Sequence, residues 1–360
     1  MGEILGIGCT HGPHLALPDE RMADIYFRRN LASELTPPEW KDPKNWPPAM
    51  REEWGDDEGV AAARKHRAVL VAGFRAAREA LDAFKPDFVL VFGDDQYENF
   101  HEDVIPPFCV YALDEVECKP RGPGARGGDG ASSSRGAGPV GGEDPLVIKG
   151  HKAAGNHIAR ELITSGFDVS CSWRLHHMDQ LGHAFVSTIR YLDWDGKGFG
   201  YPVIPFHVNC YGMDLRVPNE ANPAGSVVGR RMENVAVPPP PSPPPWRCYD
   251  VGAAVARILL ASPWRAAIVG SSSWSHASLT QKHHYLYPDV DEDRKRYHEL
   301  KSGEHRRWRD LDPEQIRDSG QHEILNWVCL AGAMEGRKAD ILAYSESFIF
   351  NSSKAVALFG

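Results

Sequence analysis

Three short apolar runs in this chain each end in a cluster of polar, chemically versatile side chains. The middle run, DFVLVF, is apolar on both faces and rich in β-branched and aromatic residues, which is typical of a strand buried within a parallel sheet. Because the carboxyl ends of parallel strands meet at one edge of a sheet, we expect the clusters to converge there. The runs cover residues 4–9, 87–92 and 266–269, and the clusters that follow them are His11, then Asp94, Asp95 and Gln96, then His276.

Helical patterns separate the strand-like runs. Residues 59–84 carry apolar side chains at helical spacing, and Pro86 ends that pattern. Strands alternating with helices predict one α/β domain with a mostly parallel sheet. Further expected helices cover residues 151–165, 184–191, 251–261, 290–318 and 323–333, and further expected strands cover residues 168–172, 203–209, 348–350 and 355–359.

Two segments interrupt this alternation. Residues 18–58 are rich in Pro, Trp and charge, so we expect an irregular, partly helical excursion, and by analogy with related folds a lid over the site. Residues 119–144 are dominated by Gly, Ser, Arg and Pro and cannot bury a face, which predicts a flexible surface insertion. The sequence therefore predicts a single domain over residues 1–360 that carries both segments.

Charge and hydropathy argue against two classes of partner. Forty Lys and Arg against 49 Asp and Glu give a formal charge of -9 with no basic stripe, which argues against nucleic acid. No run of about 18 apolar residues is present, which argues against a membrane span, and the first residues lack the pattern of a secretory signal. The seven cysteines form no CxxC pair and predict reduced, mostly buried thiols. We therefore expect a cytoplasmic protein.

Histidines and acidic residues together indicate a metal site. The chain has 16 histidines, and His322 and Glu323 stand at the start of an expected helix. Histidine and carboxylate ligands with open coordination positions are the set that non-haem Fe(II) favours. Motifs of other catalytic classes are missing, namely HExxH, the GxSxG elbow and the glycine-rich phosphate loops.

Six short motifs, in the same order along the chain, resemble those of the class III extradiol ring-cleavage dioxygenases, the superfamily of protocatechuate and gallate dioxygenases. This resemblance implies a three-layer α/β fold around a central mostly parallel sheet, and an enzyme that forms homo-oligomers. The motifs are GIGCTHGP at 6–13, PDFVLVFGDDQYENF at 86–100 with IP at 105–106, LGHAF at 181–185, IPF at 204–206 with PWRC at 245–248, SSSWSH at 271–276, and SG at 319–320 with EILNW at 323–327 and AGA at 331–333.

The same resemblance implies a role for individual residues. Fe(II), bound by His11, Glu323 and a third ligand, would support the opening of a catecholic aromatic ring with O2 as co-substrate. His276 would be the acid/base group that takes a proton from a substrate hydroxyl and returns it during ring opening. His183 would hydrogen-bond the dioxygen or the substrate.

One turn departs from the superfamily pattern. The second iron histidine of the superfamily lies in an Asn-Asp-His turn, whereas this chain reads Gly-Asp-Asp-Gln at residues 93–96, a form that resembles a variant branch. By position Asp95 replaces the histidine, and Gln96 is the next candidate ligand. With Asp95 the Fe(II) site would have a net charge near zero instead of +1 and would polarise a bound catechol less. His14, His101 or His183 could also fill the position.

Two other functions are compatible with the loss of a histidine ligand. A superfamily member that kept the fold and lost the oxidative chemistry would act as a metal-binding, ligand-binding or interaction protein. A Zn(II) or Mn(II) hydrolase could use the same pocket. The presence of His183 and His276 beside the expected ligands favours the enzyme, since a scaffold has no physical need for a proton shuttle. The expected partners are a small aromatic substrate and further copies of this chain.

Overall fold

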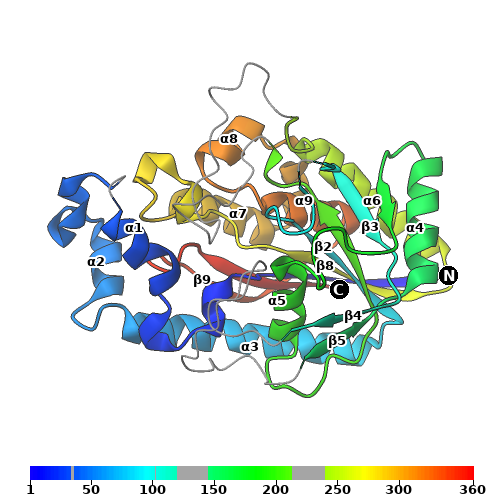
Figure 1. The fold of residues 1–360 in the computed structure, drawn as a ribbon, viewed down its shortest axis with the longest axis horizontal. Helices are drawn as coiled ribbons and strands as arrows, with labels where there is room; N and C mark the ends of the chain where they lie inside the picture. The colour runs from blue at the N-terminus through cyan, green and yellow to red at the C-terminus, as the bar shows by residue number, and fades with distance from the viewer. Residues whose placement is uncertain (34–35, 102, 120–144, 213–239) are drawn as a thin grey trace.

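An eight-stranded sheet forms the centre of the molecule (Figure 1). The computed structural model describes the chain except for residues 34–35, 102, 120–144 and 213–239. The strands follow the order β6-β3-β7-β2-β8-β1-β10-β9, and β4 and β5 pair separately. Their bounds are β1 (Glu3–Cys9), β2 (Phe88–Gly93), β3 (Phe108–Tyr111), β4 (Glu115–Cys118), β5 (Leu146–Lys149), β6 (Ser170–Ser172), β7 (Val203–Val208), β8 (Arg265–Ser271), β9 (Ala339–Ser345) and β10 (Lys354–Phe359).

The four central strands of the sheet, β7, β2, β8 and β1, are parallel to one another. Strand β3 pairs antiparallel with β7, and β10 pairs antiparallel with β1 and β9. The expected mostly parallel sheet is therefore confirmed for its centre. The carboxyl ends of the central strands lie along one edge, where their following loops can meet.

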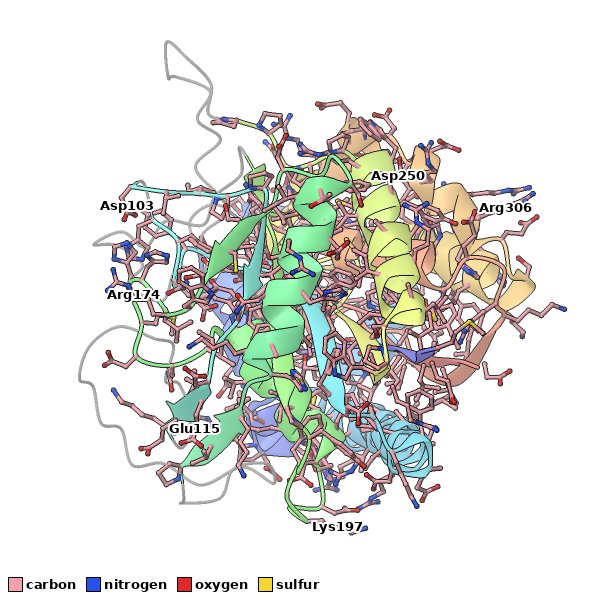
Figure 2. All side chains as sticks on the ribbon, turned by 90° about the vertical axis from the view of Figure 1, so that its right-hand side faces the viewer. Asp103, Glu115, Arg174, Lys197, Asp250 and Arg306 are labelled. Carbon is pink, nitrogen blue, oxygen red and sulfur yellow. The ribbon has the colours of Figure 1, made fainter. Side chains whose placement is uncertain are left out.

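Helices cover both faces of the sheet and make three layers. Side chains of β2 alternate between the faces: Phe88, Leu90 and Phe92 enter one buried core, and Val89 and Val91 enter the other. Helices α4, α6 and α9 cover the first face, and α3 and α5 cover the second (Figure 1). In Figure 2 α4 and α6 lie side by side, with Asp250 marking α6. The helices are α1 (Arg29–Ala32), α2 (Pro48–Trp54), α3 (Val60–Phe84), α4 (Lys152–Thr164), α5 (His183–Leu192), α6 (Pro245–Ala261), α7 (Val290–Ser302), α8 (Pro313–Asp318) and α9 (Ile324–Ala333).

The long helix α3 and the helix α6 show how local sequence sets the element bounds. Helix α3 ends at Phe84 because Lys85 takes a left-handed conformation (φ 52°) and Pro86 cannot continue a helix. Helix α6 begins at Pro245, six residues before the expected start, because proline fits the first helical position, where its missing N–H would have no partner.

The excursion at residues 18–58 is a string of short helical turns that belongs to the core. Phe27, Trp46 and Met50 are buried in the same cluster as α3. Trp40 packs against the ring of His284, which is distant in the sequence, with ring centroids 5.0 Å apart. The irregular, partly helical form is as expected, and the role as a lid stays a prediction. The insertion at 119–144 lies outside the described residues apart from Lys119.

The expected strand at residues 348–350 is wrong. The strand lies earlier, as β9, and residues 348–350 turn so that Ile349 and Phe350 point into the core. The backbone N–H groups of Phe348 and Ile349 donate to the carboxylate of Glu53 in α2, at 2.6 and 3.2 Å, instead of to a neighbouring strand.

Two further observations concern the helices and the cysteines. Within the described residues, none of the helices combines the length and hydrophobicity that crossing a lipid bilayer requires. All seven cysteines are free thiols, and six of them are buried.

Candidate metal centre

Three loops at the carboxyl edge of the sheet bring His11, Asp94 and Glu323 together. His11 follows β1, Asp94 follows β2, and Glu323 immediately precedes α9. His11 Nε2 lies 3.2 Å from Glu323 Oε2 and 3.7 Å from Asp94 Oδ1. All three side chains are buried, and among the described residues they form the group of His, Cys, Asp or Glu side chains that could hold a metal ion. The predicted convergence of strand ends therefore occurs.

The two buried carboxylates make this site strongly attractive to a cation. Burial alone would lower the pKa of His11, but the charges of Glu323 and Asp94 outweigh it and raise the pKa to about 9. Burial, together with the charge of Glu323, raises the pKa of Asp94 to about 6. The pKa of Glu323 is held well below its usual value by His276 and His11, although burial opposes this. The protein therefore needs positive charge here, which a proton or a metal ion can supply.

The carboxylate of Glu323 is oriented so that one oxygen remains for a ligand. Its Oε1 accepts hydrogen bonds from the Tyr211 hydroxyl and, at 2.8 Å, from the Gln96 amide. Its Oε2 is buried and has no hydrogen-bond donor. That oxygen lies 3.2 Å from His11 Nε2 and 3.4 Å from His276 Nε2. A buried acceptor that faces two imidazole nitrogens fits a metal ligand.

The donor set fits a divalent first-row metal. With metal–ligand bonds of about 2.1 Å, ligand atoms at right angles lie about 3.0 Å apart, close to the 3.2 Å between His11 and Glu323. One imidazole and two carboxylates suit Fe(II) and Mn(II), whereas thiolates, which would favour Zn(II) or copper, are not in the group. Ser271 Oγ lies 3.0 Å from His11 Nδ1 and fixes the ring so that Nε2 faces the carboxylates.

Asp94, and not Asp95, lies beside His11 and Glu323. The carboxylate of Asp95 turns away and accepts the backbone N–H groups of Glu98 and Asn99, both at 2.9 Å. Asp94 Oδ1 accepts from the Asn326 amide at 3.1 Å. The candidate ligand thus moves by one residue, because neighbouring residues at the end of a strand point to opposite sides.

Gln96 reaches the centre as a hydrogen-bond donor. Its amide nitrogen faces Glu323 Oε1 and, at 3.0 Å, the hydroxyl of Tyr211. The reversed amide would place two oxygens against each other, so the carboxylate fixes this orientation. Gln96 therefore supports the glutamate, and its use as the third ligand stays a prediction without geometric support.

His276 stands next to the three-residue group. Its Nδ1 lies 2.9 Å from the carbonyl oxygen of Trp274, so Nδ1 carries the proton and Nε2 faces Glu323. The chain on either side of it is firmly held: Ala277 N–H donates to the Asn351 carbonyl at 2.7 Å, and His276 N–H donates to the Gly320 carbonyl at 3.0 Å. Gly320 has a φ of 67°, and a Cβ there would lie 2.9 Å from the His276 carbonyl oxygen. Only glycine suits that position.

His183, the first residue of α5, lies on the other side of His11. The two imidazole rings meet edge to face, with centroids 5.1 Å apart. Its Nδ1 is 2.8 Å from Glu98 Oε2. The structure therefore brings His11, Glu323, His276 and His183 together, as expected from the sequence.

The other two histidines considered as ligands lie elsewhere. His14 is buried near Lys354 and His66, and burial, followed by the charge of Lys354, holds its pKa well below the usual value. His101 stacks between Tyr97 and His177, with ring centroids 4.5 and 4.1 Å away.

Four residues of the centre escaped the sequence analysis: Asp94 as a ligand, Tyr211, Asn326 and Glu98. Tyr211 follows strand β7 closely, so the rule that polar residues gather behind strands could have found it. Asn326 lies one helical turn after Glu323, a spacing that places both on one face of α9. Nothing in the sequence singles out Glu98.

Part of this chain matches a described enzyme family. Residues 232–357 match the family described as "Catalytic LigB subunit of aromatic ring-opening dioxygenase". The matched range contains His276 and Glu323 and leaves out His11 and Asp94.

Curated relatives and a solved structure are also similar to the chain. A protein of Pseudomonas putida named 2,3-dihydroxyphenylpropionate/2,3-dihydroxicinnamic acid 1,2-dioxygenase 2 is 30% identical over 156 residues, which are 43% of this chain and 41% of that protein. Its counterpart from Rhodococcus jostii (strain RHA1) is 27% identical over 164 residues, 46% of this chain and 44% of that protein. The chain therefore spans less than half the length of these relatives. A crystal structure of uncharacterized protein JW3007 from Escherichia coli K12 has a TM-score of 0.43 and 10% identity, over 80% of this chain and 92% of that one.

The family match and the curated relatives confirm the relationship that the sequence motifs indicated, at the level of the superfamily. The variant branch stays a prediction.

Proposed function

We propose that this chain, which is homologous to the class III extradiol ring-cleavage dioxygenases, is itself a non-haem Fe(II) enzyme that opens a catecholic aromatic ring with O2. Three side chains would hold the iron: His11, Asp94 and Glu323. His276 is the proposed acid/base residue, and His183 the proposed hydrogen-bond partner of the reactants.

One observation carries this proposal. Glu323 Oε2 is buried without a hydrogen-bond donor while its partner oxygen accepts two, and His11 Nε2 and His276 Nε2 both face it. A metal ligand and a proton carrier thus lie side by side at the same carboxylate. An interaction protein without chemistry has no need of that arrangement.

The protein's own residues have distinct tasks in the proposed reaction. When bound, Fe(II) supplies the redox chemistry that amino-acid side chains lack and the template that brings the two reactants together. His276 takes the proton of a substrate hydroxyl at Nε2, because Nδ1 already donates to the Trp274 carbonyl. It returns that proton when the ring opens. Tyr211 and Gln96 keep the ligand carboxylate fixed throughout, so that only one oxygen faces the reactants.

The three proposed ligands also determine the net charge of the metal ion and its ligands together. Two carboxylates and a neutral imidazole leave a divalent ion with no net charge, whereas two histidines and one carboxylate would leave +1. A neutral site binds an anionic catecholate less strongly and loses an electron more readily. We therefore propose that this centre depends more than a two-histidine site does on its acid/base histidine to ionise the substrate.

The substrate is proposed from the relatives. Their printed names give 2,3-dihydroxyphenylpropionate and a 2,3-dihydroxycinnamic acid as substrates. A small aromatic with two neighbouring hydroxyl groups is therefore the proposed substrate class for this chain. Assembly into homo-oligomers stays a prediction.

The test is metal content followed by oxygen uptake. Anaerobically purified protein is expected to bind about one Fe(II) per chain. It is then expected to consume O2 with at least one member of a panel containing catechol, protocatechuate, gallate and 2,3-dihydroxyphenylpropionate, with the yellow ring-opened product visible by absorbance. Protein that is folded and binds no stoichiometric metal would contradict the proposal and support a role in binding.

A further inference from the structure

Glu98 and His183 form a carboxylate–imidazole pair at the edge of the metal centre. Glu98 Oε2 lies 2.8 Å from His183 Nδ1, and the backbone N–H of His183 lies 3.2 Å from both carboxylate oxygens. The side chains are 13% and 17% exposed, so water screens the pair poorly. The His183 ring also meets the ring of His11 edge to face. The pair therefore joins the loop after β2 to a proposed metal ligand.

The surroundings of the Glu98 carboxylate select an anion. The backbone N–H of His183 donates to it at the N-terminal end of α5, where the helix dipole favours negative charge, and Nδ1 of the same residue lies within hydrogen-bond distance. Gly182 is the residue that allows this approach, because a Cβ there would lie 2.9 Å from Glu98 Oε2. A carboxylate presents an acceptor at both of its oxygens, whereas a neutral amide would turn an NH2 donor toward one of the His183 nitrogens.

The loop that carries Glu98 is fixed at several points. Asp95 accepts the N–H groups of residues 98 and 99. Asn99 Oδ1 accepts the N–H of His176 at 2.6 Å. Glu98 is thus held where it is, independently of His183.

We propose that Glu98 is a positioning residue, which fixes the tautomer and ring orientation of His183. An ionised carboxylate only accepts, so Nδ1 of His183 carries the proton, and in the neutral ring Nε2 is the basic nitrogen left for the metal centre. His183 then accepts a hydrogen bond from a reactant at Nε2 without turning. This inference rests on the proposed function for its catalytic consequence, and on the geometry alone for the tautomer.

The decisive variant is Glu98→Gln, which keeps size and removes the charge. If the amide oxygen takes the place of Oε2, the NH2 group opposes the backbone N–H of His183. If the NH2 group takes that place, it donates to Nδ1 and the proton moves to Nε2, the exchange that inactivates a serine-protease triad when its aspartate becomes asparagine. We expect kcat to fall at least about tenfold with KM changed much less, which marks an interaction made in the transition state. Glu98→Asp keeps the charge and is expected to recover part of kcat.

The tautomer is measured directly, without turnover. Protein labelled with ring-15N histidine gives two-bond 1H–15N spectra that separate the two neutral tautomers, and a His183→Gln sample identifies the signals of that residue. The Nδ1–H pattern is expected for the wild type, and loss of that pattern for Glu98→Gln. Asp103→Asn is the matched control, since it makes the same change in the exposed pair with His177. We expect it to leave both the His183 spectrum and kcat unchanged.

The outcomes separate this inference from the proposed function. A His183 spectrum that is the same in Glu98→Gln as in the wild type overturns the positioning role, as does an equal loss of kcat in Glu98→Gln and Asp103→Asn. A wild-type protein that cleaves none of catechol, protocatechuate, gallate and 2,3-dihydroxyphenylpropionate, while its His183 tautomer depends on Glu98, overturns the proposed function and supports the positioning role of Glu98.

Discussion

Two clusters of ionisable side chains are buried in this molecule, and their charges are compensated in different ways. One is the candidate metal centre of His11, Asp94 and Glu323. The other, the lysine cluster, surrounds Lys354 of β10, whose ammonium is fully buried and donates to the carbonyl oxygens of Phe350 and Ser352 at 3.2 and 2.6 Å. Both regions place ionisable groups where water cannot reach them.

The difference lies in where the positive charge comes from. The lysine cluster has its cation attached to the chain, and backbone oxygens satisfy it. At the metal centre, within the part of the chain that the structure describes, the two carboxylates have only histidines as ionic partners. Buried carboxylates without a Lys or Arg partner are strongly unfavourable unless a cation is supplied from outside. The lysine cluster is therefore satisfied within the folded chain, whereas the candidate metal centre favours the binding of a cation.

The largest expected effect comes from removing the central carboxylate. Glu323→Gln is expected to weaken Fe(II) binding by more than about 100-fold, since even the outer hydrogen-bond partners of metal ligands are worth about 10- to 100-fold. Ring cleavage is expected to be lost with it. Fe(II) titration under nitrogen measures the affinity, and Glu314→Gln on the surface of α8 is the control. Undiminished affinity in Glu323→Gln would remove the distinction between the two clusters.

The neighbouring aspartates are expected to separate binding from stability. Asp94→Asn should lower metal affinity at least about tenfold with little change in folding. Asp95→Asn should leave the affinity unchanged and lower the free energy of unfolding by about 1–3 kcal/mol, because its amide would oppose one of the backbone N–H groups that the carboxylate accepts. Metal titration and denaturant unfolding of both variants measure this. The reverse result would restore Asp95 as the ligand.

Metal affinity is expected to depend on pH in a defined window. His11 must lose its proton to bind a metal, and its pKa in the metal-free protein is about 9, while that of Asp94 is about 6. Between these values one proton is released per metal bound, so the affinity should rise about tenfold per pH unit. Below pH 6 a second proton adds to the slope. Calorimetry in buffers of different ionisation heats counts the protons, and an affinity independent of pH from 6 to 9 would contradict the proposed site.

The smallest expected effect concerns the lysine cluster. Burial lowers the pKa of Lys354 to about 7, although Glu53 and Asp293 oppose the shift. The unfolded chain, with a lysine pKa of about 10.4, therefore binds more protons than the folded one between these values. This contribution makes stability rise with pH, by at most about 1.4 kcal/mol per unit. Lys354→Met should lack that rise, whereas the exposed Lys338→Met should keep it, as measured by unfolding at pH 7 to 9.5. Equal slopes would show that Lys354 is not titrating in the folded state.

Much of the fold followed from the sequence because its signals are local. The long apolar period of α3, the stop at Pro86 and the buried run of β2 depend on neighbours in the chain. The false strand at residues 348–350 shows the limit. Its apolar side chains were correctly expected to be buried, but the partner of its backbone is Glu53, about 300 residues away in the sequence. No local pattern contains that information.

The sequence predicted which loops form the candidate site, but not which of their side chains face one another. The strand-end rule placed His11, the Asp-Asp-Gln turn and His276 at one edge. It could not choose between Asp94 and Asp95, because that choice depends on how the chain leaves β2. The strand-end rule could not find Glu98 either, because Glu98 reaches His183 only where Gly182 of another loop comes close to it.

The turn before β10 has a consequence for anyone who wishes to transplant this site. Asn351 holds Ala277, the neighbour of His276, and residues 348 and 349 of the same turn are held by Glu53 from the excursion between β1 and α3. A designer who grafted only the proposed ligands and the proposed acid/base residue His276 onto another scaffold would leave behind the parts that hold His276 in place. The smallest portable unit of this candidate site is therefore not a set of side chains. It includes the excursion, so recombination between relatives would have to exchange the two segments together.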